Sequence, residues 1–203
     1  MKIPYSKVYC NGNEKQYITE VLESGWLTTA GKTMSFEKKM ADYVGARYAC
    51  AVNSCTSALH IGLDALGVKA GDKVFVPDMT FTASAEVVRY MNADPVFLDV
   101  AYGTSLITPE ILLEGIRQHP DVRFLVVVHY GGQAAQMPSN GHPGILDICK
   151  NHNIRIIEDA AHAFPTKLSG QMVGSLGDIT CFSFYANKTI TTGEGGMLMT
   201  NDP

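Results

Sequence analysis

Short apolar runs alternate with longer amphipathic segments along the chain from about Arg47 onward. This alternation is typical of a mostly parallel β-sheet in which crossover helices join successive strands. We therefore predict an α/β fold, with three α/β/α layers around one seven-stranded sheet. The predicted strands are residues 48–52, 73–76, 96–100, 124–129, 155–158, 179–184 and 196–200.

Three amphipathic segments between these strands carry helix signals at their ends. Gly67 follows the first segment as a left-handed C′ residue would, and Thr108 and Pro109 begin the third as an N-cap and a proline at N1. The run 124–128 is apolar at every position, which predicts a strand covered on both faces and close to the centre of the sheet. The predicted crossover helices are residues 54–66, 81–91 and 109–118.

Two further helices are predicted ahead of the sheet, at residues 13–23 and 35–44, with Gly45 ending the second. We expect both to be peripheral. Residues 1–45 then form peripheral N-terminal helices and a loop, and residues 46–203 form the sheet domain.

Two loops stand out in this organisation. Residues 24–31 contain the only tryptophan, Trp26, for which burial in the core and a place in a site or interface loop are equally open. Residues 131–144 contain two prolines and four glycines and are predicted as a loop.

Composition and charge exclude several classes of protein. Of the 203 residues, 46% are hydrophobic and 18% charged, as in a soluble domain with a sizeable core and unlike disordered or fibrous chains. The formal charge of -4 comes without runs of like charge, so no nucleic-acid or membrane partner is expected. The N-terminal sequence lacks the apolar core of a signal peptide, so we expect a cytoplasmic protein. The five scattered cysteines favour reduced thiols and no metal site.

Ligands bind beyond the carboxyl ends of the strands in such sheets, so the candidate chemistry lies just after each strand. Residues 53–60 place hydroxyls and free N–H groups at the start of a helix. This arrangement suits a phosphate, although N-capping by Ser54 alone explains the same stretch. Phe81 follows the second strand, where an aromatic ring either stacks on a flat ligand or belongs to the core.

Acids, a histidine and a lysine follow the later strands. Glu158 and Asp159 end an apolar run, and His162 comes three residues later. A carboxylate there can hold a protonated ring nitrogen or a metal, or cap a turn. Lys188 follows another apolar strand and precedes a glycine-rich segment. Such a lysine is either solvated or desolvated in a pocket, where its pKa falls and it can act as a Schiff-base nucleophile.

A phosphate seat, a ring stacker, a carboxylate and a lysine thus occur in order, each after a predicted strand. Together they fit pyridoxal phosphate (PLP). The sequence resembles the DegT/DnrJ/EryC1/StrS family of PLP-dependent nucleotide-sugar aminotransferases, which share the fold of aspartate aminotransferase. The matching stretches are SGWLTTAGK, AVNSCTSALH, VPDMTFTASA, PVFLDV, VVHYGGQ, IIEDAAHAFP and SLGDITCFSFYANKTITTGEGG.

The resemblance implies a role for each matched residue. Lys188 is expected to hold PLP covalently and Asp159 to pair with its pyridine nitrogen. His162 is expected to face the cofactor, and these three are the predicted catalytic residues. Phe81 is expected to stack on the ring. The expected phosphate ligands are Thr56, Ser57 and Ser183.

The resemblance also implies substrates and partners. Glutamate is the expected amino donor, and the keto group of a nucleotide-linked deoxysugar is the expected acceptor, in a homodimer. Relatives are longer, so residues 1–203 are expected to be the PLP-binding large domain, with the C-terminal small domain absent. A truncated, non-catalytic remnant is the alternative of another class.

Three departures and two rival functions complete the picture. Cys55 replaces the glycine of the family's S-G-T motif, so we expect a reshaped phosphate loop or a reactive thiol. Residues 131–144 form a less compact connection than the short one expected in the family. The chain is also shorter than the relatives. A PLP-dependent sugar 3-dehydratase has histidine where this chain has Lys188, and a nicotinamide-binding Rossmann domain requires a G-x-G-x-x-G turn that the sequence lacks.

Overall fold

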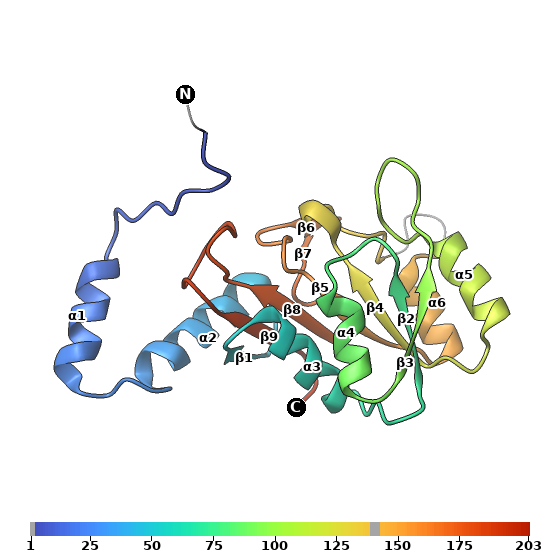
Figure 1. Ribbon diagram of the computed structural model, residues 1–203, viewed down its shortest axis with the longest axis horizontal. Coiled ribbons are helices and arrows are strands. Elements are labelled where there is room, and N and C mark those ends of the chain that lie inside the picture. Colours follow the sequence, from blue (N-terminus) through green and yellow to red (C-terminus); the bar gives the residue numbers. More distant parts are fainter. Residues whose placement is uncertain (1–2, 139–142) are drawn as a thin grey trace.

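The computed structural model describes residues 3–138 and 143–203. Its centre is a seven-stranded sheet with strand order β1-β9-β8-β5-β4-β2-β3, as Figure 1 shows. The strands are β1 (Tyr48–Val52), β2 (Lys73–Pro77), β3 (Asp94–Leu98), β4 (Phe124–Val128), β5 (Arg155–Asp159), β8 (Ile179–Ser183) and β9 (Gly196–Thr200). A two-stranded hairpin, β6 (Lys167–Leu168) and β7 (Gln171–Met172), lies outside this sheet.

Strand direction brings one set of strand ends together. β2 pairs in parallel with β3 and β4, β4 with β5, and β5 with β8, whereas β9 runs antiparallel to both of its neighbours, β1 and β8. The carboxyl ends of the parallel strands and the amino end of β9 therefore meet at one edge. The prediction of a mostly parallel seven-stranded sheet is confirmed.

The predicted strands agree with the structure to within two residues at their ends. The strand predicted at 96–100 lies at Asp94–Leu98, because Pro95 takes part in the pairing with β2. β3 is an edge strand, where the missing N–H of proline can face away from the ladder. The apolar strand β4 lies next to the central strand β5 and is buried over its last four residues, as predicted.

Helices cover both faces of the sheet. The helices are α1 (Glu14–Ser24), α2 (Gly31–Val44), α3 (Cys55–Ala65), α4 (Ala83–Tyr90), α5 (Pro109–Gln118) and α6 (Ile145–His152), with a short 3-10 turn η1 (Tyr130–Gly132). Apolar residues of α3 and α4 pack against one face, and those of α2, α5 and α6 pack against the other. Neither α6 nor the β6–β7 hairpin was predicted from the sequence.

Local capping matches the sequence signals. The side chain of Thr108 accepts the N–H of Ile111 at the start of α5, and Gly45 ends α2 in the left-handed conformation. The predicted loop 131–144 is irregular apart from η1 in its described part, and its residues 139–142 lie outside the described residues.

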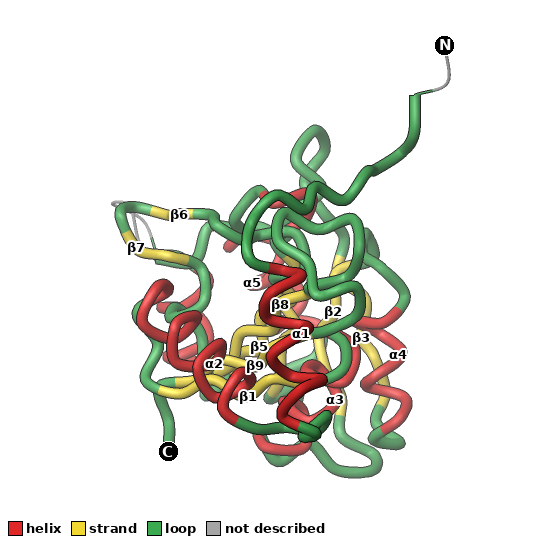
Figure 2. The backbone as a smooth tube through the Cα atoms, turned by 90° about the vertical axis from the view of Figure 1, so that its left-hand side faces the viewer, coloured by secondary structure: helices red, strands yellow, loops and turns green. Residues whose placement is uncertain are grey.

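The N-terminal segment differs from the prediction in one respect. α1 buries no residue and stands apart from the sheet in Figure 1, as expected; in Figure 2, viewed from that side, it lies in front of the sheet. α2 is not peripheral, because Met40 and Val44 are buried in a cluster with Phe182 of β8. Trp26 is 61% exposed, so its interpretation as a core residue is wrong. Over residues 3–138 and 143–203, no helix has the length and hydropathy needed to cross a membrane.

A close contact between β9 and α3 gives the first testable prediction. A β-carbon on Gly196 would lie 2.3 Å from the carbonyl carbon of Ser54 and 2.5 Å from the amide nitrogen of Cys55. Gly196→Ala should therefore push the start of α3 outward and lower the free energy of unfolding by about 1–3 kcal/mol, as overpacking does. Urea unfolding measures the change.

Gly31→Ala is the matched control, because a β-carbon on Gly31 meets nothing within 4 Å. Equal stability of the two variants would contradict the close-contact argument.

Candidate active site

A cavity of about 550 Å³ lies at the edge where the strand ends meet. This volume is within the range of pockets that bind small molecules, ~300–1,000 Å³. The walls come from segments after β1, β2, β4, β5 and β8 and from the segment before β9. The position agrees with the rule that ligands bind beyond the carboxyl ends of parallel strands.

Six of the seven predicted site residues line this cavity: Thr56, Phe81, Asp159, His162, Ser183 and Lys188. Ser57 does not line it. The Ser57 hydroxyl donates to Oδ1 of Asn53 at 2.6 Å, and its N–H donates to Oγ of Ser54 at 3.1 Å. Ser54 is therefore a true N-cap of α3, and the capping interpretation of this stretch is confirmed.

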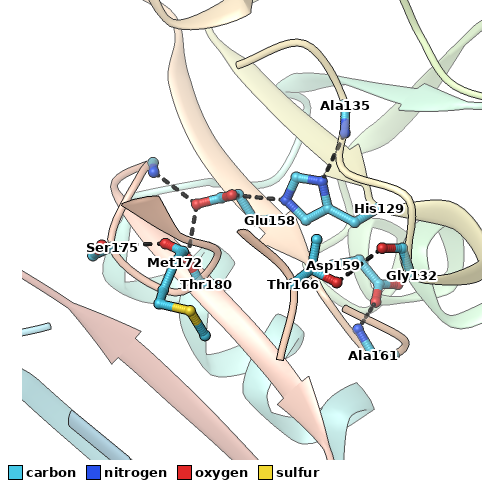
Figure 3. A network of polar contacts seen from close by, with 11 residues as sticks. His129, Gly132, Ala135, Glu158, Asp159, Ala161, Thr166, Met172, Ser175 and Thr180 are labelled. Carbon is cyan, nitrogen blue, oxygen red and sulfur yellow. Dashed lines mark hydrogen bonds and ion pairs between the residues drawn. The ribbon is translucent and has the colours of Figure 1, made fainter. Parts of the chain in front are cut away.

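Asp159 is the buried acid of the cavity, with 6% of its surface exposed at the end of β5. Its Oδ2 accepts the hydroxyl of Ser84 at 2.6 Å, and its Oδ1 accepts the N–H of Ala161 at 3.1 Å. The second of these bonds is drawn in Figure 3. A buried carboxylate is stable only when donors surround it, and these donors hold it at the cavity wall.

Lys188 and His162 lie on the same cavity and have shifted ionisation. Burial lowers the pKa of Lys188, and the negative charge of Asp159 opposes this shift. Burial and the nearby Lys188 also lower the pKa of His162, again opposed by Asp159. A lowered pKa gives Lys188 a larger fraction of neutral, nucleophilic amine near neutral pH than an ordinary lysine has.

A second buried carboxylate stabilises the strand ends behind the cavity. Glu158 accepts the N–H of Gly177 at 2.6 Å, the hydroxyl of Thr180 at 2.7 Å and Nε2 of His129 at 2.8 Å (Figure 3). Ala135 donates its N–H to Nδ1 of His129, so the ring proton is on Nε2 and points at Glu158. Our sequence reading assigned no role to His129.

In the described part of the chain, no group of three or more His, Cys, Asp and Glu side chains could hold a metal ion. The cavity wall instead carries a carboxylate, an amine, hydroxyls and a helix N-terminus. This set suits an organic anion better than a metal.

Comparison with known proteins identifies the family. Residues 9–203 match the DegT/DnrJ/EryC1/StrS aminotransferase family. The chain belongs to this family. The match covers the sheet and every segment that lines the cavity except the part at Tyr5.

Individual relatives support the same assignment. The chain is 44% identical to the spore coat polysaccharide biosynthesis protein SpsC of Bacillus subtilis, over 98% of this chain and 50% of the relative. It is 41% identical to a GDP-perosamine synthase of Caulobacter vibrioides, over 95% of this chain and 50% of the relative. The PLP-form of Spr1654 from Streptococcus pneumoniae superposes with a TM-score of 0.88 at 30% identity, covering 100% of this chain and 54% of that one. The chain thus spans about half the length of these relatives.

Cys55, where the family motif has glycine, begins α3 at the base of the cavity. Burial, together with the nearby Asp159, raises the pKa of its thiol well above the ordinary value. Its Sγ lies 3.6 Å from the carbonyl oxygen of Cys181, which the thiol proton can reach. A thiol that stays protonated is a weak nucleophile, so the expectation of a reactive thiol is not supported.

Several cavity residues were missed in the sequence, among them Tyr5, Thr80 and Glu194. Thr80 and Glu194 lie within stretches that match the family. Nothing in their residue type or sequence position, however, indicated a role in the site. Tyr5 comes from the N-terminal segment, far from any predicted strand. The loop around Trp26 does not line the cavity.

The shifted ionisation of Lys188 gives a second prediction. ¹³C-dimethylation of the lysines, followed by an NMR pH titration, should show Lys188 titrating at lower pH in the folded protein than in the urea-unfolded protein. Since the charge of Asp159 raises the pKa of Lys188, Asp159→Asn should lower it further. The same Lys188 titration in folded and unfolded protein would contradict a desolvated amine.

Proposed function

We propose that this chain supplies the cofactor-binding part of a PLP-dependent aminotransferase that moves an amino group from glutamate to the keto group of a nucleotide-linked deoxysugar. One observation carries the proposal. The buried carboxylate of Asp159 and the partly desolvated amine of Lys188 line one cavity, with the N-terminus of α3 at its base.

The residues present fit PLP part by part. A helix N-terminus with hydroxyls beside it suits a phosphate, and here Thr56 on α3 and Ser183 at the end of β8 line the cavity. Asp159 supplies an acceptor for the ring nitrogen, and Lys188 supplies an amine for the aldehyde. Phe81 is 76% exposed at the cavity, which leaves its ring face free to stack on a ligand ring. Ser57 fits less well because its hydroxyl already donates to Asn53.

The chemistry follows from these placements. PLP, when bound, supplies an electron-withdrawing ring that makes the α-carbon proton of an attached amine acidic. Asp159 would keep the ring nitrogen protonated, because a buried carboxylate favours a cation beside it. Lys188 would hold the cofactor and, as a free amine, would be the base that takes the α-carbon proton and returns it. His162, with its lowered pKa, stays a neutral hydrogen-bonding group at the cavity wall.

The substrate class rests on the relatives. The names of the Caulobacter and Bacillus relatives refer to a GDP-linked sugar and to polysaccharide biosynthesis. A keto sugar joined to a nucleotide is the acceptor that such products require, and glutamate is the donor implied by the sequence resemblance. A sugar dehydratase is disfavoured by Lys188, since those enzymes have histidine at this position.

We further propose that residues 1–203 are the large domain of the enzyme, which works in the cytoplasm as a homodimer. Support for the dimer comes from large apolar side chains left exposed on the N-terminal helices and the loop between them, among them Leu22, Trp26, Leu27 and Met34. Exposed apolar surface of this extent is typical of protein interfaces.

Covalent attachment at Lys188 is the test of the proposed function. In the full-length protein, borohydride reduction with PLP should leave a pyridoxyl group on Lys188, found by peptide mass spectrometry, and glutamate should convert the cofactor to its amino form. Lys188→Ala should lose both, while Lys15→Ala on the exposed helix α1 should keep both. An adduct on another lysine would overturn the assignment of Lys188, whereas PLP binding without amino transfer to a keto-sugar nucleotide would favour the non-catalytic remnant.

Loss of the Asp159 charge gives a further prediction. Asp159→Asn should keep PLP bound but lower kcat by about a thousandfold or more, because the carboxylate stabilises the transition state more than the ground state. Asp42→Asn, at an exposed ion pair with Lys38, is the control and should leave kcat unchanged. Near-normal turnover of Asp159→Asn would mean that the carboxylate has only a structural role.

A further inference from the structure

Ser84 is a buried hydroxyl that the proposed chemistry does not use. It lies on α4 with 0% of its surface exposed, and its Oγ is 2.6 Å from Oδ2 of Asp159. This is the shortest hydrogen bond that Asp159 makes among those of its side chain, with 3.1 Å to the N–H of Ala161 and 4.0 Å to Sγ of Cys55. A short O–H···O bond to a carboxylate is among the strong hydrogen bonds of proteins.

The direction of the bonds follows from the chemistry of the groups. A carboxylate only accepts, so the single proton of the Ser84 hydroxyl points to Asp159. The hydroxyl of Thr80 lies 2.7 Å from Oγ of Ser84, and it must therefore donate to Ser84. The result is a directed chain from Thr80, on the cavity wall, through the buried Ser84 to Asp159.

The chain fixes an orientation that nothing else near Asp159 can fix. The terminal torsion of an aspartate is broad, so a carboxylate held at one oxygen can still rotate. Ala161 and Cys55 both approach Oδ1, and the thiol is a weak donor at 4.0 Å. Ser84 alone approaches Oδ2 among the hydrogen bonds found in residues 3–138 and 143–203.

We propose that Ser84 is a positioning residue: its hydroxyl, supported by Thr80, holds the Asp159 carboxylate in one orientation toward the ligand in the cavity. The inference rests on the function proposed above. Ser84 touches neither the cavity nor the reacting atoms, since it is absent from the cavity wall, and it acts only through Asp159.

The first measurement needs no bound cofactor. In Ser84→Ala, the ¹³C-carboxyl NMR signal of Asp159 in the cofactor-free, full-length protein should differ in chemical shift from that of the natural protein, because the carboxylate loses the hydroxyl that donates to Oδ2. The other titratable groups that interact with Asp159 are Cys55, His162, Cys181 and Lys188, and the variant retains all of them. Ser84→Thr, which keeps the hydroxyl, should restore the natural value.

The second measurement separates positioning from simple stability. Ser84→Ala should lower kcat by about tenfold to a hundredfold, the effect of losing one hydrogen bond to a charged group, with KM for glutamate close to that of the natural protein. Ser175→Ala, which removes a hydrogen bond to Met172 outside the cavity, is the control and should leave kcat unchanged. If Ser84→Ala does not fold, Ser84→Cys, of similar volume and weaker donor strength, is measured in its place.

Two failures are distinguishable. An Asp159 carboxyl chemical shift and a kcat equal to those of the natural protein in Ser84→Ala, or in Ser84→Cys if alanine does not fold, would overturn the positioning role while leaving the proposed function intact. A natural full-length protein that neither binds PLP nor transfers an amino group would overturn both.

Discussion

Two consecutive carboxylates at the end of β5 impose the strictest physical demand in this molecule. Glu158 is fully buried and Asp159 almost so, and side chains that are neighbours in a strand point to opposite faces of the sheet. Removing a carboxylate from water costs several kcal/mol unless hydrogen-bond donors replace the water. This cost is on the order of the whole free energy of unfolding of a domain. The fold must therefore provide donors on both faces of one strand.

The donors on the two faces do different work. Those of Glu158 come from His129 after β4, from Thr180 on β8 and from Gly177 just before it, so they join three adjacent strands at the cavity edge. Those of Asp159 leave it on the cavity wall, available to a ligand. Glu158 stabilises the ends of these strands. Asp159 lies on the cavity wall with oriented hydrogen-bond donors already around it, which is the arrangement that electrostatic catalysis needs.

The elements that depend on a local pattern of residues were predicted from the sequence. The features that depend on contacts between distant residues were not. The buried strand β4 is visible as an apolar run, and six of the seven predicted site residues do line the cavity at the strand ends. The antiparallel direction of β9 is set by its partners β1 and β8, which no local pattern reports. Helix α6 has only eight residues and follows a segment rich in proline and glycine, so its signal was too short to read.

The same division applies within the site. Lys188 and Asp159 were predicted because each belongs to an ordered set of polar residues after predicted strands, and because both lie in stretches that resemble the family's motifs. The bond from Ser84 to Asp159 spans 75 positions and that between His129 and Glu158 spans 29, so neither partner is visible beside the other in the sequence. Serine is common at such places, and nothing in its neighbours marks Ser84 as the donor to a buried acid.

The place of β9 between β1 and β8 has a consequence for how the molecule is made. β1 has β9 as its strand partner, so residues 48–52 have no ladder to join until residues 196–200 have been synthesised. During translation, the parallel strands β2, β3, β4, β5 and β8 can assemble first, whereas β1 stays unpaired until β9 has been made. The helix start that follows β1 is then set by the late arrival of Gly196 against Ser54. The corner of the cavity at the start of α3 is thus completed only after residues 196–200 have been synthesised, so a nascent chain lacks this part of the cavity wall until β9 inserts.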